Sequence, residues 1–442
     1  CMLFGFILLL SNQRVCNDRL WGFPQMNGKA LPAPLRISID ARSAHVIRRG
    51  HPWIWRSAVR ATPQKLDTGA LVTVFDTRGQ FVAHGLWDSS SPIAARVYSR
   101  IPQETLGLGT LTSAVLRAVD DRNGWFDLAD TDAFRLCHGE GDRVPGVVLD
   151  RYGTIVVARF DGEAISTWSE MLLGSLWPAL KARGFTALAV RDPTRGNASV
   201  RVFAGERIPD TITVRERGMK MVVDLMKGQK TGAFLDQREN RRRIRALASR
   251  ARVLNLFSYS GGFSCAAALG GAAHVTSVDI AHAAHAIAHE TFRQNGIDPN
   301  AHSFITADVF LFLERAIDSK ERFDLVISDP PSFAPNEKSL PKALHAYRRL
   351  HEACLRVVAK GGLFCAASCS SHVTLDAFIG TLDDEVLAGR PFRIVETFGQ
   401  PADHPTVPGW PEGRYLKFVV MAEAAARQAS PSHYRDENPC AQ

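Results

Sequence analysis

Cysteine is scarce in this chain, which contains eight in 442 residues. So few cysteines exclude a disulfide-stabilised scaffold. They form no C-x-x-C pairs, so we expect no zinc ribbon and no metal site, and a reduced compartment such as the cytoplasm. Charged residues make up only 22% of the chain, with both signs mixed, which argues against disorder. The length suggests about three domains.

Long apolar runs are also missing. Residues 1–10 (CMLFGFILLL) are apolar, but about 20 such residues are needed to span a bilayer, and polar residues follow at once. The run lacks the charged start and the cleavage site of a signal peptide. We therefore expect no membrane contact. We interpret residues 1–34 as an unstructured or non-native extension, an over-extended reading frame with Met26 as a candidate start, and residues 426–442 as a tail.

Positive charge is concentrated in one short segment. Residues 36–65 contain seven Lys and Arg against the single acid Asp40, a net +6 of the chain's +8. Trp53 and Trp55 lie among them, and nucleic-acid bases stack on aromatic rings while arginine contacts phosphate. A nucleic-acid surface is one interpretation, and a solvated face around two core tryptophans is the other. The candidate RNA-binding residues here are Arg48, Arg49, Trp53 and Arg56.

The first two predicted domains differ in pattern. Two alternating runs, 71–75 and 80–85, predict a hairpin within a β-rich module at 35–100. Residues 101–215 mix apolar strands with a helical stretch at 166–182. They predict a small α+β domain without visible catalytic chemistry.

Residues 216–425 have the pattern of an α/β domain. After a hairpin, 212–216 and 219–225, short β-branched runs alternate with helical segments. This alternation predicts a parallel sheet covered on both faces. The last two strands have no helix between them and are expected to pair antiparallel. The predicted strands of this sheet are 253–257, 275–279, 303–307, 325–328, 363–368, 392–398 and 415–422.

A turn with Gly261 and Gly262 follows the first of these strands. Glycines there let a ligand approach the backbone at the carboxyl end of the sheet. The turn is not G-x-G-x-x-G and no Walker lysine follows, which disfavours dinucleotides and nucleoside triphosphates. Asp279 and Asp308 end the next two strands, where carboxylates can accept hydrogen bonds from an adenosyl group. S-adenosylmethionine therefore fits better than NAD. The candidate cofactor residues are Phe257, Tyr259, Ser260, Gly261, Gly262, Asp279, Asp308 and Asp329.

Two candidate catalytic residues follow the next strands. Asp329 precedes Pro330 and Pro331, which stiffen its loop, and Cys369 lies among polar residues. C5 of cytosine attacks a sulfonium methyl group poorly unless a thiolate first adds to C6. Cys369 would supply that thiolate, and Asp329 would stabilise the developing charge at N3. The base that removes the C5 proton is not identified, although His372 is a candidate. The alternative interpretations are that Asp329 simply belongs to a turn after a strand and that Cys369 is a buried, inert cysteine.

Basic residues also recur on a helix predicted from about Asp236. Arg238, Arg241 and Arg245 fall at i, i+3 and i+7 and predict a basic stripe opposite an apolar face. Such a stripe is usually solvated. Because it is close in sequence to the cofactor turn, a contact with RNA or cofactor is the second interpretation, and Arg238 joins the candidate RNA-binding residues.

Taken together, eight segments between residues 36 and 422 resemble the ribosomal RNA large subunit methyltransferase I family. The segments are HPWIW (51–55), GEGDRVPGVVLDRYG (139–153), KTGAFLDQREN (230–240), NLFSYSGGFS (255–264), SDPPSF (328–333), SCSS (368–371), ADHP (402–405) and PEGRYLK (411–417). This resemblance implies a PUA-like RNA-binding domain, a small central α+β domain and a Rossmann-like class I S-adenosylmethionine-dependent methyltransferase domain that makes 5-methylcytosine in 23S ribosomal RNA. It implies Cys369 as nucleophile, and Asp279, Asp308 and Asp329 as cofactor and base contacts. Other RNA cytosine methyltransferases carry a further cysteine in the fourth-strand motif, and its absence here leaves product release unassigned.

Two other functions stay open. A methyltransferase acting on a guanine nitrogen would use Asp329 to position the base, with Cys369 structural. A non-catalytic RNA-binding protein would use the sheet only as a scaffold, although the intact turn and the strand-end acids argue against it. In either enzyme we expect the target base to be flipped into the pocket. The sequence does not identify the nucleotide, or whether naked RNA or an assembled particle is the substrate, and a homodimer stays open.

Overall fold

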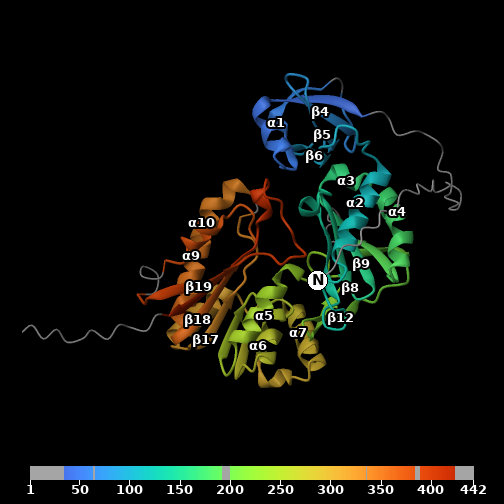
Figure 1. Ribbon diagram of the computed structural model, residues 1–442. Helices are drawn as coiled ribbons and strands as arrows, with labels where there is room; N and C mark the ends of the chain where they lie inside the picture. Colours follow the sequence, from blue (N-terminus) through green and yellow to red (C-terminus); the bar gives the residue numbers. More distant parts are fainter. Residues whose placement is uncertain (1–33, 63–64, 192–199, 335, 384–388, 424–442) are drawn as a thin grey trace, which may run out of the picture. The chain divides into compact units, whose positions relative to one another are not determined.

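A computed structural model describes residues 34–62, 65–191, 200–334, 336–383 and 389–423. The interpretations of residues 1–33 and 424–442 lie outside this part of the chain. The described elements include three sheets of five or more strands and a separate hairpin (Figure 1). None of the described helices is long and apolar enough to cross a membrane.

The N-terminal sheet has the strand order β2-β6-β5-β4-β1-β3. β4 and β5 pair antiparallel and confirm the predicted hairpin. Its turn forms because the Asp76 carboxylate accepts hydrogen bonds from the backbone N–H groups of Arg78 and Gln80, each at 2.9 Å. Alternate apolar residues of the strands and of helix α1 form the core. The elements are β1 (Leu35–Ile39), α1 (Ala41–Arg48), β2 (Trp53–Trp55), β3 (Val59–Ala61), β4 (Leu71–Asp76), β5 (Phe81–Trp87) and β6 (Ile93–Ser99).

The central sheet has the order β11-β10-β9-β8-β7. The two faces of this sheet pack on different elements. One face packs on helices α2 and α4. The other packs on the hairpin β12–β13 and on helices α6 (Gly262–Leu269) and α7 (His282–Gln294). The predicted helix at 166–182 corresponds to α4, which begins at Ser169. The short helix α3 ends at Ser166, and Trp168 between the two helices donates its indole N–H to the carbonyl of Gly69 at 2.9 Å. The elements are α2 (Leu108–Asp121), β7 (Ala133–His138), β8 (Val147–Tyr152), β9 (Ile155–Phe160), α3 (Glu163–Ser166), α4 (Ser169–Ala182), β10 (Ala187–Arg191), β11 (Val200–Gly205), β12 (Thr211–Glu216) and β13 (Met219–Asp224).

The C-terminal sheet has the order β16-β15-β14-β17-β18-β20-β19. β14 to β18 are parallel, and β19 and β20 pair antiparallel, as predicted. Alternate buried residues of β14, β17, β18 and β20 face opposite sides of the sheet. Helices α5 and α6 cover one face, and α8, α9 and α10 cover the other. Figure 1 shows α5 and α6 apart from α9 and α10. The predicted α/β architecture is therefore confirmed. The strands are β14 (Arg252–Leu256), β15 (His274–Asp279), β16 (Ser303–Thr306), β17 (Phe323–Ser328), β18 (Val358–Ser368), β19 (Phe392–Phe398) and β20 (Lys417–Glu423). The helices are α5 (Arg238–Leu247), α6 (Gly262–Leu269), α7 (His282–Gln294), α8 (Val309–Asp318), α9 (Leu340–Val357) and α10 (Leu375–Ile379).

Candidate active site

Several strand ends of the C-terminal sheet meet at one edge. β14, β15 and β17 are in register, with Leu256 opposite both Val278 and Ser328. Residues that follow parallel strands therefore come together at the carboxyl edge, where open α/β sheets bind ligands. They line a cavity of about 630 Å³. The predicted site residues found in its lining are Phe257, Tyr259, Ser260, Gly262, Asp279, Asp308, Asp329 and Cys369.

The turn between β14 and α6 depends on unusual backbone conformations. Phe257, Tyr259 and Gly261 have φ angles of 56°, 46° and 75°. A Cβ atom at Gly261 would lie 2.7 Å from the Cβ of Ala288 in α7. The absence of a side chain at Gly261 therefore makes room for α7. Gly261 is not among the residues that line the cavity, and its contact with the cofactor stays a prediction. Gly262 does face the cavity.

The two strand-end acids shape the backbone around the cavity. Asp279 accepts hydrogen bonds from the N–H groups of Tyr259 and Ala281, each at 2.8 Å. Asp308 is the N-cap of α8 and accepts from Phe310 and Leu311. A carboxylate has about four acceptor positions, so both acids can still accept hydrogen bonds from a ligand.

The side chains at this end of the cavity fit S-adenosylmethionine. The hydroxyl of Ser258 is buried and has no hydrogen-bond partner among the described residues, so a ligand can supply one. Ile280, beside Asp279, is 73% exposed, an apolar side chain available to an adenine ring. When S-adenosylmethionine binds, Asp279 would hold the ribose, Ile280 the adenine and the Ser258–Gly262 turn the remainder, and the cofactor would supply an activated methyl group.

Asp329 is held by a relay of amide side chains. The Nε2 of Gln237 donates to Oδ2 of Asp329 at 2.9 Å. The Oε1 of Gln237 accepts from Nδ2 of Asn240 at 2.6 Å, which fixes the amide orientation. Burial raises the pKa of Asp329 to about 7, and the nearby negative charge of Asp236 adds to the shift. A large fraction of Asp329 is therefore protonated near neutral pH and can donate a hydrogen bond.

Cys369 differs from the other cysteines of the described chain. It is partly exposed and lines the cavity, whereas the other four are buried: Cys137, Cys265, Cys354 and Cys365. Burial and the charge of Asp329 raise the pKa of the Cys369 thiol, while Lys230 and Lys417 oppose the shift. The Nζ of Lys417 donates to the carbonyls of Ser370 and Tyr415 at 2.5 and 2.8 Å. This places a buried cation beside the thiol, where it favours the thiolate.

Comparison with known proteins agrees with this geometry. A family model described as S-adenosylmethionine-dependent methyltransferase matches residues 164–416, and a PUA-like domain model matches residues 37–100. A ribosomal RNA large subunit methyltransferase I from Erwinia tasmaniensis is 36% identical over 393 residues, which cover 86% of this chain and 97% of that protein. Its Escherichia coli counterpart (strain UTI89) is 33% identical over 385 residues, with the same coverage.

The chain belongs to the ribosomal RNA large subunit methyltransferase I family. The fold also resembles that of a Streptococcus mutans protein described as a SAM-dependent methyltransferase. Its TM-score is 0.77 at 23% identity, covering 88% of this chain and all of that chain. This family member is therefore an S-adenosylmethionine-dependent methyltransferase with a PUA-like domain.

Sequence reasoning missed a cluster of polar residues in the cavity of this methyltransferase. Lys230 and Asp236 line it, and their side chains form an ion pair of 2.6 Å between Nζ and Oδ2. The hydroxyl of Tyr415 donates to the same Oδ2 at 2.8 Å. All three residues stand in segments that resemble the family, KTGAFLDQREN and PEGRYLK, which was the available signal. His372, the candidate base, is exposed and is not among the residues that line the cavity.

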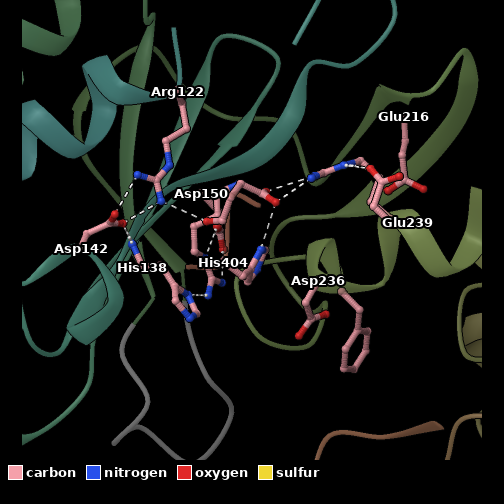
Figure 2. A network of polar contacts seen from close by, with 12 residues as sticks. Arg122, His138, Asp142, Asp150, Glu216, Asp236, Glu239 and His404 are labelled. Atoms are coloured by element: carbon pink, nitrogen blue, oxygen red, sulfur yellow. Dashed lines mark hydrogen bonds and ion pairs between the residues drawn. The ribbon is translucent and has the colours of Figure 1, made fainter. Parts of the chain in front are cut away.

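The predicted basic stripe on α5 is wrong for its first two members. Arg238 is 1% exposed, and its guanidinium pairs with both carboxylate oxygens of the buried Asp403 at 2.6 and 3.1 Å. Arg241 is also buried and pairs with Glu216. Figure 2 shows the surrounding network, from Arg122 with Asp142 on one side to Glu216 and Glu239 on the other. Arg238 therefore cannot contact RNA, because it neutralises an internal carboxylate.

The candidate RNA-binding residues of the PUA-like domain fall into two groups. Arg48 and Arg49 are both exposed, and Arg48 pairs with Asp76 at 2.9 Å. Trp53 is half-buried: its indole N–H donates to Glu140, and its ring packs edge-on against Trp410. Trp53 is therefore not a free stacking platform, contrary to the prediction.

Arg56 also serves the fold of this domain. Its guanidinium donates to the carbonyls of Asp88 and Ser91 and lies over the ring of Trp87. Trp55 is the more exposed tryptophan of the pair, at 43%. The structure thus divides the basic segment between the two interpretations, with Arg48 and Arg49 left as candidates for RNA contact.

Proposed function

We propose that this methyltransferase modifies C5 of a cytosine in 23S ribosomal RNA through a covalent adduct with Cys369. Two relatives with full-length similarity carry the name ribosomal RNA large subunit methyltransferase I, which supports the substrate class. The observation that carries the chemistry is that the partly exposed Cys369 lines the same cavity as Asp329 and the cofactor turn.

In the first step the Cys369 thiolate attacks C6 of the flipped cytosine. A C6–S bond forms, and the electron pair of the C5=C6 double bond makes C5 nucleophilic. Asp329, as the neutral acid, donates to N3 and stabilises the charge that develops on the ring. The Lys417 ammonium, which donates to the carbonyl of Ser370 next to Cys369, partly offsets the burial that raises the pKa of the thiol.

The second half of the reaction restores aromaticity. The electron pair at C5 would form the new C–C bond with the methyl group of S-adenosylmethionine, while the methyl–sulfonium bond breaks and S-adenosylhomocysteine is the leaving group. A base then removes the C5 proton, that electron pair re-forms the C5=C6 double bond, and the C6–S bond breaks to release the Cys369 thiolate.

A trapping experiment tests the proposal. RNA that carries 5-fluorocytosine at the target position cannot lose a proton from C5, so we expect the wild-type protein to form a stable adduct that survives denaturing electrophoresis. Cys369→Ala should form no adduct and no 5-methylcytidine, while S-adenosylmethionine binding, measured by calorimetry, persists. The matched control Ser371→Ala, an exposed position two residues away, should behave as wild type. Undiminished methyl transfer by Cys369→Ala, or methylguanine as the product, would refute the covalent mechanism.

A further inference from the structure

Asp236 is a buried carboxylate with one unused oxygen. The side chain is 3% exposed, and its Oδ2 accepts from both Lys230 and Tyr415. Its Oδ1 is buried and has no hydrogen-bond partner among the described residues. A buried acceptor without a partner is costly, so it indicates a hydrogen bond that is completed by a ligand. Asp236 lines the same cavity as Asp329 and Cys369.

Asp329 presents the complementary arrangement. Its Oδ2 is engaged by Gln237, which leaves Oδ1 as the oxygen that can carry a proton toward a ligand. The two carboxyl groups interact electrostatically, since the charge of Asp236 disfavours ionisation of Asp329. The cavity lining therefore offers a hydrogen-bond acceptor at Asp236 and a donor at Asp329.

This pattern matches one pyrimidine and not the other. Cytosine has an exocyclic amine that donates and an N3 atom that accepts, whereas uracil has O4, which accepts, and N3–H, which donates. We propose that Asp236 accepts the hydrogen bond from the exocyclic amine of the target cytosine through Oδ1 while Asp329 donates to N3, so that the pair selects cytosine over uracil. This inference rests on the proposed function and adds a specificity-determining residue to it.

The charges around the pair keep the two groups in opposite protonation states. Burial favours the neutral form of Asp236, but the ammonium of Lys230, together with His404 and the Tyr415 hydroxyl, outweighs burial and holds the Asp236 pKa well below its ordinary value. For Asp329, burial and Asp236 outweigh the opposing effects of Lys230, Arg241 and Gln237. Two carboxyl groups with divided pKa values are a common way to assign one acceptor and one donor.

The test compares two bases at one position. Full-length wild type and Asp236→Asn are assayed on a 23S RNA fragment with cytosine or uracil at the mapped target, and 5-methylcytidine and 5-methyluridine are quantified by mass spectrometry. The amide of Asn can rotate and donate to O4, so we expect the cytosine-to-uracil ratio of kcat/KM to fall by at least about tenfold. The control Tyr415→Phe keeps Oδ1 and should lower activity on both bases alike. An unchanged ratio in Asp236→Asn would overturn the inference.

A second measurement does not depend on folding of the Asp236 variant. In the Cys369→Ala protein, which forms no adduct, RNA with 2-pyrimidinone at the target lacks only the exocyclic amine. We expect it to bind about tenfold more weakly than the cytosine RNA, and equal affinity would overturn the inference. If wild type makes no 5-methylcytidine, the proposed function itself fails. If it does and both tests are negative, only the role of Asp236 fails.

Discussion

The protonation of Asp329 should govern the pH dependence of methyl transfer. The reactive form needs Asp329 with its proton and Cys369 without one. Burial raises both pKa values, that of Asp329 to about 7 and that of Cys369 above its ordinary value. Below pH 7 the rate should therefore rise about tenfold per pH unit as thiolate forms. Above pH 7 the rate should level off, because the fraction of protonated Asp329 then falls with pH by the same factor by which the fraction of Cys369 thiolate rises.

Replacing Asp329 with asparagine separates these two effects. The amide N–H can donate to N3 at any pH, so the requirement for a proton on residue 329 disappears. At pH 8 only about one tenth of wild-type Asp329 is protonated, so the wild-type rate should change little between pH 7 and 8. The rate of Asp329→Asn should instead continue to rise, by about tenfold over the same interval, from a lower starting value.

The assay is a single-turnover measurement with enzyme in excess over RNA, quenched between pH 5.5 and 9. Single turnover isolates the steps up to methyl transfer from product release. Asp376→Asn, an exposed acid on α10, serves as the control and should keep the wild-type profile. Parallel profiles for wild type and Asp329→Asn, or a wild-type rate that rises unbroken from pH 6 to 8, would refute the role given to Asp329.

Three further predictions concern stability, catalysis and RNA affinity. Arg238→Ala leaves Asp403 buried without its ion-pair partner, so it should lower the free energy of unfolding by about 3 to 5 kcal/mol in urea titrations. Adding Asp403→Asn to this variant should restore part of the lost stability. A loss of stability below about 1 kcal/mol would contradict the pairing. Tyr152→Phe removes the hydroxyl that accepts a hydrogen bond from the N–H of Ala233 at 3.0 Å. We expect this variant to lower kcat more than it weakens S-adenosylmethionine binding. We also expect the free energy of unfolding to fall by about 1 kcal/mol. Arg49→Ala should reduce the slope of RNA affinity against salt by about 1, and an unchanged slope would exclude a phosphate contact at Arg49.

The C-terminal sheet could be predicted from the sequence because its strands are buried on both faces. A strand such as β14, with four consecutive buried residues from Val253 to Leu256, gives a short apolar run bounded by a turn. The helices between such runs connect parallel strands. The sequence alone therefore predicts that the carboxyl ends of these strands lie at one edge of the sheet. That is also why the cofactor turn, Asp329 and Cys369 could be assigned to one site in advance.

The errors arose where charge is buried. Arg238 has the helical spacing of a surface arginine, and its partner Asp403 lies 165 residues away in sequence. No periodicity indicates that a carboxylate will be placed against it, so the sequence predicted a solvated stripe. The same reason explains Trp53, whose partners Glu140 and Trp410 come from two distant segments.

The central sheet shows how a segment without catalytic residues can still determine the chemistry. Its strand β8 supplies Asp150 and Tyr152, whose side chains hydrogen-bond to Thr231 and to the N–H of Ala233. These contacts fix the stretch that carries Lys230 and leads into Asp236 and Gln237. Because Lys230 holds Asp236 ionised and Asp236 in turn raises the pKa of Asp329, the contacts from β8 bear on both carboxyl groups of the cavity. The donor and acceptor that we assign to the cytosine edge therefore depend on the packing of the central sheet as much as on the methyltransferase sheet that carries Asp329.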